Sequence, residues 1–189
     1  MYHFFVEPHQ IGAEEIRIEG ADVNHIRNVL RMKPGEEILI SSREGGDYFC
    51  RVEELEPEYV SAKILEEWEN KELPARIHLF QGLPKGDKME LIIQKAVELG
   101  AYRVVPVSMK RSVVKLDAKK ADAKRKRWNA VSESAAKQSK RSLIPEVAPL
   151  MTYKEAVKEV AGYDMVLLPY ESADGIRKTR ELLASVKPG

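Results

Sequence analysis

Apolar and polar residues alternate through the first 70 positions with the short period that is typical of β-strands. Val60, Ala62 and Ile64, for example, are separated from one another by single polar residues. Strands of such length, spaced roughly ten residues apart, favour a small barrel. One helix interrupts them, over residues 22–30, with Asp22 as its expected N-cap. The alternation predicts strands over residues 2–6, 15–18, 36–42, 48–55 and 59–68.

The pattern changes after a polar stretch at residues 70–74 that ends in a proline. Short apolar runs then alternate with segments of helical period, which favours βαβ units and a mainly parallel sheet. We therefore expect two domains, over residues 1–70 and 74–189. In the second domain the pattern predicts strands over residues 76–80, 103–107, 147–151 and 164–170, and helices after Asp87 and over residues 118–140, 153–160 and 176–186.

The helix after Asp87 has the clearest local signals. Asp87 is a favourable N-cap, Glu90 completes a capping-box pattern, and Gly100 is a typical stop. Its expected apolar face consists of Met89, Ile92, Ile93, Ala96, Val97 and Leu99.

The net charge of +1 conceals two unlike regions. Residues 1–70 carry 7 basic and 16 acidic side chains, whereas residues 85–141 carry 16 basic and 6 acidic ones. This asymmetry indicates an acidic module joined to one that attracts a polyanion. The alternative is a solvated helix surface that happens to be rich in lysine.

Cations also gather where predicted strands end. In a parallel sheet, ligands bind beyond the carboxyl ends of the strands, so such residues predict a site for an anion. The alternative is that these segments are ordinary turns, in which glycine and proline serve the backbone geometry. The candidate residues after three successive strands are Lys85 and Lys88; Lys110, Arg111, Ser112 and Lys115; and Pro169, Tyr170 and Glu171.

Two further basic clusters are candidates for phosphate contacts. The helix over residues 118–140 carries eight cations and is followed directly by a ninth, Arg141. Gln138 and Arg141 are polar groups near its end that we expect to reach back towards the strand ends. Trp128 on this helix is expected to pack inside the protein instead of stacking on a base. In the acidic first domain, His25, Arg27, Arg31 and Lys33 form a local basic cluster for which RNA contact is the preferred interpretation.

Other function classes find no support in the sequence. It contains no apolar run of membrane-spanning length, no signal-peptide pattern and a single cysteine, Cys50. Its four histidines lack metal-ligand spacing, and dinucleotide, P-loop, zinc-protease and serine-hydrolase motifs are missing. The residues alone therefore predict a soluble, cytoplasmic two-domain α/β protein that holds no metal and binds a polyanion.

Five segments, in this order, resemble a known family. They are HIRNVLRMKPGEEI (25–38), QGLPKGDKMELIIQKAVELGA (81–101), RSVVK (111–115), RKRWNAVSESAAKQSKRSLIPEV (125–147) and LLPYE (167–171). Together they are similar to the RsmE-type 16S rRNA (uracil-N3)-methyltransferases, and the similarity covers essentially the whole chain.

The resemblance implies a PUA-like β-barrel followed by a SPOUT-class (trefoil-knot) α/β domain. It also implies a homodimer that transfers a methyl group from S-adenosyl-L-methionine to N3 of a uridine in the decoding region of 16S rRNA, as naked RNA or in the small subunit. By their match to family positions, the expected RNA-binding residues are His25, Arg27, Arg31, Lys85, Lys88, Ser112, Lys115, Gln138 and Arg141. Arg111 is the expected catalytic residue, and Pro169, Tyr170 and Glu171 are the expected cofactor-binding residues.

The family pattern continues beyond Gly189 with a glycine-rich segment and a knot segment. We therefore expect this sequence to be C-terminally incomplete, and a chain of this length to lack methyltransferase activity by itself. The main alternative is a non-catalytic RNA-binding protein that uses the same barrel and basic helix. A third hypothesis is an enzyme that binds a nucleotide through the loop at residues 82–86. The missing P-loop pattern disfavours it.

Overall fold

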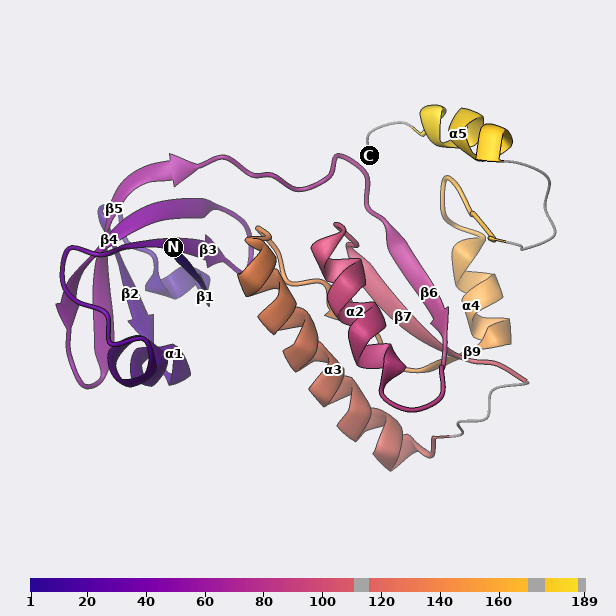
Figure 1. Cartoon of the computed structure of the whole chain (residues 1–189), viewed down its shortest axis with the longest axis horizontal. Helices are drawn as coiled ribbons and strands as arrows, with labels where there is room; N and C mark the ends of the chain where they lie inside the picture. The colour runs from indigo at the N-terminus through magenta and orange to yellow at the C-terminus, as the bar shows by residue number, and fades with distance from the viewer. Residues whose placement is uncertain (111–115, 170–175, 187–189) are drawn as a thin grey trace. The chain divides into compact units, whose positions relative to one another are not determined.

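The computed structural model describes residues 1–110, 116–169 and 176–186 (Figure 1). The chain divides into two compact units. Unit 1 consists of residues 1–72 and 130–145, and unit 2 of residues 73–129 and 146–189. The long helix α3 (Ala118–Ser139) contributes its first part to unit 2 and its last part to unit 1.

Unit 1 is built on a five-stranded sheet of order β1-β3-β4-β5-β2. All neighbouring strands are antiparallel except β1 and β3, which are parallel. The sheet curls but stays open, because β1 and β2 lie at the two ends of the order and are not paired with each other. The strands are β1 (Tyr2–Val6), β2 (Glu15–Glu19), β3 (Glu37–Ser42), β4 (Asp47–Leu55) and β5 (Tyr59–Trp68), which confirms the five predicted strands.

The predicted helix of unit 1 is present in a different form. After the short 3-10 helix η1 (Pro8–Gln10), the chain forms one α-turn, α1 (Ala21–Asn24), and then a π-helical turn, η2 (His25–Val29). Asp22 is not the N-cap, because Gly20, at φ +76°, occupies that position. The Asp22 carboxylate instead accepts hydrogen bonds from Lys137 Nζ at 3.2 and 3.3 Å.

The core of unit 1 lies between the concave face of the sheet and the α1–η2 segment. Alternate strand residues point into it, as the period-two pattern predicts. Ile16, Ile26, Ile38 and Ile40 are completely buried there. The remaining buried members are Phe4, Val6, Ile18, Val23, Met32, Cys50, Val52, Val60 and Ala62.

Unit 2 contains a small, wholly parallel sheet, as predicted. β7 (Arg103–Ser108) lies between β6 (His78–Gly82) on one side and β8 (Glu146–Val147) and β9 (Met151–Thr152) on the other. β7 is buried on both faces, which explains its nearly continuous apolar sequence. The helices of this unit are α2 (Lys88–Glu98), the first part of α3, α4 (Tyr153–Val160) and α5 (Ile176–Ala184).

Three details of the second region differ from the predictions. The expected strand over 147–151 is split into β8 and β9, with Pro149, which has no N–H to donate, between them. In α2, Asp87 occupies the N-cap position but its side chain makes no capping hydrogen bond. Leu99 is 79% exposed, because only Met89, Ile93 and Val97 of α2 point inward.

The predicted strand over 164–170 is also wrong for its described part. Residues 165–169 form no strand, and Val166, Leu167 and Leu168 are exposed. None of the described strands pairs with this segment, so its backbone gains no ladder hydrogen bonds. An apolar sequence is therefore not sufficient to make a strand here.

Candidate functional site

The carboxyl ends of β6 and β7 lie next to each other in unit 2, as expected for parallel neighbours. Gly82 is in register with Val107, and the Leu83 N–H donates to the Val107 carbonyl at 2.9 Å. A Cβ atom on Gly82 would lie 3.1 Å from Met109 Cγ, so the loops that follow the two strands are in contact. The sheet thus brings together the residues after β6 and those after β7.

Three of the predicted cationic residues are visible at this edge. Lys85 and Lys88 follow β6, Lys110 follows β7, and all three are exposed. None of them forms an ion pair with another residue that the structure describes. Arg111, Ser112 and Lys115 lie outside the described residues.

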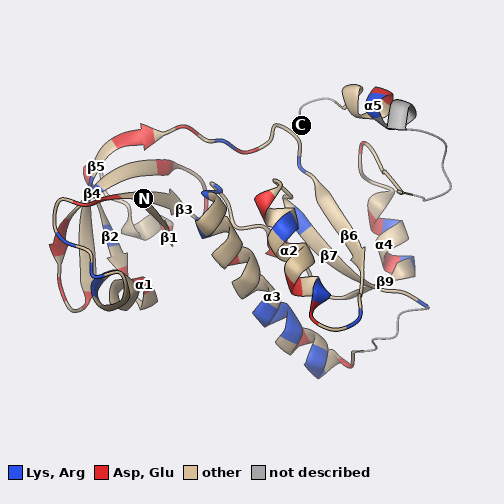
Figure 2. Ribbon diagram, in the orientation of Figure 1, with Lys and Arg blue, Asp and Glu red and all other residues tan. Residues whose placement is uncertain are grey.

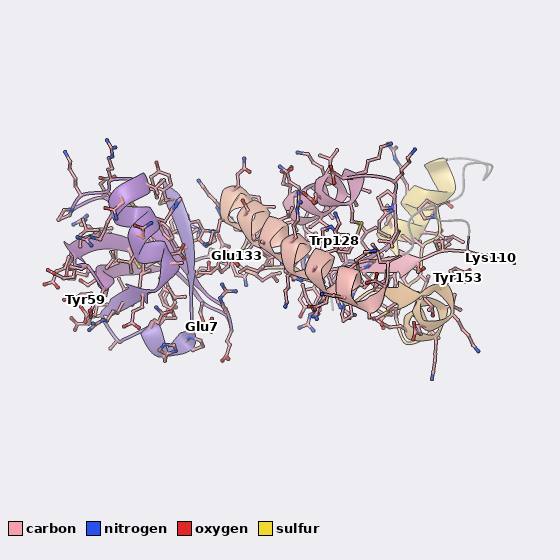
Figure 3. All side chains as sticks on the ribbon, turned by 90° about the horizontal axis from the view of Figure 1, so that it is seen from below. Glu7, Tyr59, Lys110, Trp128, Glu133 and Tyr153 are labelled. Carbon is pink, nitrogen blue, oxygen red and sulfur yellow. The ribbon has the colours of Figure 1, made fainter. Side chains whose placement is uncertain are left out.

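A small pocket separates the loop after β6 from α3. It is lined by the apolar side chains of Leu83, Met89 and Trp128, and Lys124 contributes a cation to its wall. Trp128, which is labelled on α3 in Figure 3, is only 4% exposed, so it packs inside the unit, as predicted. It lines the pocket together with the segment that leads from β6 into α2. The other lining residues are Pro84, Gly86, Asp87, Glu90 and Leu116.

Figure 2 shows that Lys and Arg are concentrated in the first part of α3. These cations differ in what they contact. Arg127 holds the Glu90 carboxylate with Nε at 2.8 Å and Nη2 at 2.9 Å. Arg125 donates from Nε to the Val147 carbonyl at 3.2 Å and pairs with Glu146 at 3.1 Å. These two arginines therefore fasten α3 to α2 and to β8, and they are not simply a solvated basic surface.

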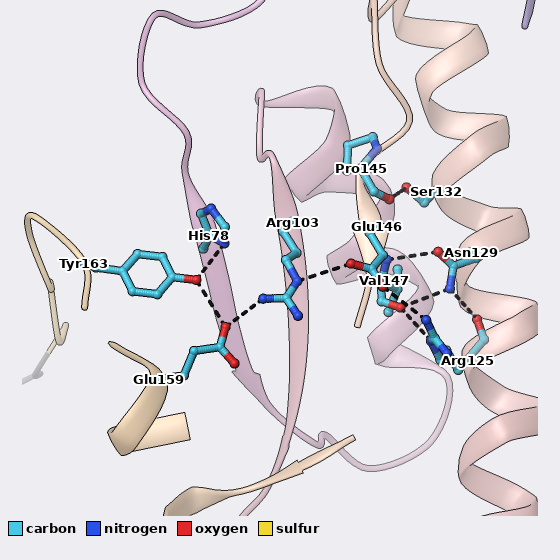
Figure 4. A network of polar contacts seen from close by, with 10 residues as sticks. All are labelled: His78, Arg103, Arg125, Asn129, Ser132, Pro145, Glu146, Val147, Glu159 and Tyr163. Atoms are coloured by element: carbon cyan, nitrogen blue, oxygen red, sulfur yellow. Dashed lines mark hydrogen bonds and ion pairs between the residues drawn. The ribbon is translucent and has the colours of Figure 1, made fainter. Parts of the chain in front are cut away.

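A polar network that the sequence did not predict lies at the opposite, amino end of the sheet (Figure 4). Arg103, the first residue of β7, pairs with Glu159 at 2.7 Å and with Glu146 at 3.4 Å. The Tyr163 hydroxyl lies 2.9 Å from His78 Nδ1 and 3.2 Å from Glu159. The residues are too far apart in sequence for their spacing to have indicated this network.

The ionisation of this network follows from its surroundings. Burial, with the adjacent Arg103 cation, lowers the pKa of His78, which favours a neutral imidazole. Burial and the Glu159 carboxylate raise the pKa of Tyr163, so its hydroxyl keeps its proton. Because it lies at the strand amino ends, the network joins α4 to the sheet and does not face the candidate site.

The predicted residues of unit 1 have varied environments. His25 and Arg31 are exposed and Arg27 is partly buried, all on or directly after η2. Arg31 has a φ of +53°, a conformation that is unusual for a residue with a side chain. Gln138 is exposed, whereas Arg141 is 8% exposed and binds Glu72 through Nε at 2.8 Å. These residues belong to unit 1, and Lys85 and Lys88 belong to unit 2.

The pocket beside Trp128 is too small for a molecule as large as S-adenosyl-L-methionine. The pocket beside Trp128 has a volume of ≈ 30 Å³, whereas ligand pockets typically measure about 300–1,000 Å³. Pro169 is exposed, and Tyr170 and Glu171 lie outside the described residues. A methyl donor of this kind therefore does not fit into the pocket beside Trp128.

The described residues contain neither a metal-binding cluster nor a membrane-spanning helix. No group of three or more His, Cys, Asp or Glu side chains is arranged to hold a metal ion in the described part of the chain. Within those same ranges, no helix is long and apolar enough to cross a membrane.

Comparison with known proteins decides the family. A model described as an RNA methyltransferase domain matches residues 71–187, and one described as an RNA methyltransferase PUA domain matches residues 18–65. The chain is 39% identical, over 92% of its length, to a protein of Bacillus subtilis named ribosomal RNA small subunit methyltransferase E, of which it covers 69%. The chain belongs to the ribosomal RNA small subunit methyltransferase E family.

Solved structures of related proteins agree with this assignment. A crystal structure titled only as a hypothetical protein superposes with a TM-score of 0.90 at 38% identity, covering 99% of this chain and 76% of that one. The ribosomal RNA small subunit methyltransferase E of Neisseria gonorrhoeae, solved bound to S-adenosyl methionine, gives a TM-score of 0.72 at 33% identity, covering 83% of this chain and 64% of that one. The predicted fold class, a PUA-like module followed by a SPOUT-class α/β module, is therefore confirmed.

Proposed function

We propose that this protein methylates N3 of a uridine in the decoding region of 16S rRNA, and that S-adenosyl-L-methionine is its methyl donor. The observation that carries the proposal is the pair of lysine-bearing loops at the carboxyl ends of β6 and β7, in a chain of this family. Parallel sheets bind their ligands at this edge, and exposed cations there suit an RNA backbone. The printed names of the relatives specify small-subunit rRNA, which supports the choice of RNA.

Each module has a proposed role. Residues 1–70 form the PUA-like RNA-binding domain, in which His25, Arg27 and Arg31 contact rRNA. Residues 74–189 form the methyltransferase domain, in which Lys85, Lys88, Ser112 and Lys115 hold the substrate strand. Gln138 is a further proposed rRNA contact. Arg141 is also proposed to contact rRNA. Its guanidinium is held in a fixed position by the Glu72 carboxylate.

The methyl donor is proposed from the relatives and not from a pocket in the described residues. S-adenosyl-L-methionine supplies an electrophilic methyl group when it is bound. Pro169, Tyr170 and Glu171 are the residues of this chain that we propose to border it. The assembly is proposed to be a cytoplasmic homodimer that acts on 16S rRNA or on the small ribosomal subunit.

Arg111 is proposed to act in the chemistry. Methylation at N3 requires loss of the N3 proton, and negative charge then develops on the two flanking carbonyl oxygens of the uracil ring. A guanidinium placed beside them stabilises this charge more strongly in the transition state than in the ground state. Arg111→Ala is therefore expected to lower turnover by about a hundredfold or more, with a much smaller loss of RNA affinity.

The test is the nucleoside content of 16S rRNA. Deleting the gene in its host should remove one N3-methyluridine, as measured by nuclease digestion and mass spectrometry. Wild-type protein should restore it, and the Arg111→Ala variant should restore far less. If the modified nucleoside persists after deletion while the purified chain still binds RNA, the chain is a non-catalytic RNA-binding protein and the proposed function fails.

A further inference from the structure

The four consecutive cations Lys124–Arg127 on α3 do not share one environment. Arg125 and Arg127 are held by Glu146 and Glu90, as described above. Lys126 pairs with Asp122 one turn earlier on the same helix, at 3.1 Å. Among the residues that the structure describes, Lys124 is the member of this run that forms no ion pair.

Lys124 is also the member of the run that faces the loop after β6. It lines the pocket beside Trp128 together with Gly86 and Asp87. Lys85 lies in the same loop and Lys88 is the first residue of α2, and both are exposed. Lys85 and Lys88 do not line the pocket themselves, but each stands between two lining residues in the sequence, so the three lysines lie on or next to the segments that form this rim.

The acidic groups at this rim do not cancel the three positive charges. Glu90 lines the same pocket, but its negative charge is already paired with the Arg127 guanidinium. Asp87 is the remaining acid, and it is exposed. Lys85, Lys88 and Lys124 against Asp87 leave an excess of two positive charges, which an anion can neutralise.

We propose that Lys124 acts with Lys85 and Lys88 as a phosphate clamp, which binds the backbone of the RNA strand at the rim of this pocket. Lys126, of the same helix and the same charge, lies outside the clamp. The proposal rests on the proposed function, because RNA is taken as the anion. It assigns the phosphate contact of the basic helix α3 to one residue, Lys124. Phosphates bound by lysine release condensed counterions, so each such contact leaves a measurable salt dependence.

The experiment compares Lys124→Gln with Lys126→Gln in the 189-residue chain. Binding of a fluorescein-labelled, single-stranded oligouridylate is measured by anisotropy over a series of KCl concentrations. Loss of one phosphate contact on a single strand should reduce the slope of log K against log[KCl] by about 0.7, which is about a fivefold loss of affinity at 0.1 M salt. Lys126→Gln should leave the slope unchanged, although it removes the same charge from the same helix.

Two further variants separate local contact from general effects. Lys124→Arg keeps the cation and should retain the wild-type slope. The double variant Glu90→Gln/Arg127→Gln removes an ion pair at constant net charge and should also retain it. Far-UV circular dichroism of each variant checks that the fold is preserved.

Each outcome decides between the claims. Equal slopes for Lys124→Gln and Lys126→Gln, both below wild type, would overturn the clamp while leaving the RNA proposal standing. Wild-type chain that shows no salt-dependent RNA binding would overturn both. A slope lowered in Lys124→Gln alone, and recovered in Lys124→Arg, supports the clamp.

Discussion

Arg141 and Glu72 form a largely buried ion pair within unit 1, with side-chain exposures of 9% and 15%. The Arg141 Nε lies 2.8 and 2.9 Å from the two carboxylate oxygens, and Nη2 also contacts Glu72. The same carboxylate accepts a hydrogen bond from the Ser142 N–H at 2.8 Å. The pair thus holds the segment after α3 against the end of the N-terminal module.

Removing the acid from this pair should be costly. Glu72→Ala leaves a buried guanidinium without this carboxylate, and breaking a buried pair from one side costs about 3–5 kcal/mol. We expect a decrease of about that size in the free energy of unfolding, measured by urea denaturation. Glu19→Ala, which breaks the exposed Arg17–Glu19 pair, is the control and should cost less than about 1 kcal/mol. Equal losses in the two variants would contradict this account.

His3 should make unit 1 less stable in mild acid. Burial, with the charges of Lys137 and Lys140, lowers its pKa from 6.5 to about 4. Ser41 donates its hydroxyl proton to Asp47 and therefore accepts from His3 Nε2, 2.7 Å away. His3 Nδ1 is buried and has no hydrogen-bond partner in the described structure, so a proton there is unfavourable.

Proton linkage gives the direction in which the free energy of unfolding changes with pH. Between pH 6.5 and about 4 the unfolded chain binds a proton at His3 that the folded chain does not. The stabilisation is therefore complete above pH 6.5 and is lost as the pH falls towards 4, by up to about 3 kcal/mol. Urea midpoints at pH 7 and pH 5 measure it. His3→Gln should flatten this part of the profile, whereas His9→Gln, at an exposed position, should not.

Cys50 should be inert in the folded protein and reactive after unfolding. Its side chain is completely buried in β4, and burial raises the pKa of its thiol to about 12. Because it is the chain's only cysteine, a thiol reagent such as dithionitrobenzoate reports on this residue alone. We expect almost no reaction in native buffer and one equivalent in concentrated urea. Rapid stoichiometric reaction under native conditions would show that the sheet opens there.

Gly100 should tolerate alanine less well than Gly35 does. The two have nearly the same φ, +95° and +94°, so both variants carry the conformational cost of about 1 kcal/mol. A Cβ on Gly100 would in addition lie 2.5 Å from Leu73 Cδ1, so the exposed Leu73 side chain must shift, at a small cost, whereas a Cβ on Gly35 has no neighbour within 4 Å. Thermal unfolding of the two variants measures the difference. The double variant Gly100→Ala/Leu73→Ala should remove the steric part, and failure to do so would count against it.

Local sequence signals predicted much of the architecture, because they depend on neighbours along the chain. The alternation around Val60 and Ala62 identified β5, and the position of Gly100 identified the end of α2. Local rules were less reliable where a side chain expected to cap a helix binds a residue that is distant in the sequence. Glu90, the expected capping-box partner of Asp87, binds Arg127 instead, and Asp22 binds Lys137.

The candidate site was predictable in its location and not in its detail. The parallel pairing of β6 and β7 confirms that Lys85 and Lys110 follow neighbouring strand ends. The sequence could not show that Lys124 differs from Arg125 and Arg127 in having no ion-pair partner among the described residues. The acids that pair with the two arginines, Glu146 and Glu90, lie elsewhere in the chain. Arg111, Ser112, Lys115, Tyr170 and Glu171 lie outside the described residues, so their roles stay predictions.

The amino-acid sequence by itself determined the two modules, the type and order of most elements, the family and the edge of the sheet at which chemistry is expected. These properties follow from the periodicity of apolar and polar residues and from short motifs, both of which involve residues close together in the sequence. Only the tertiary structure decided that residues 165–169 form no strand, that Arg141 is held by Glu72, and which cations of α3 are already neutralised. Such outcomes depend on which groups meet across long separations in the chain, and hydrogen-bond and charge partners of that kind are set only when the chain packs.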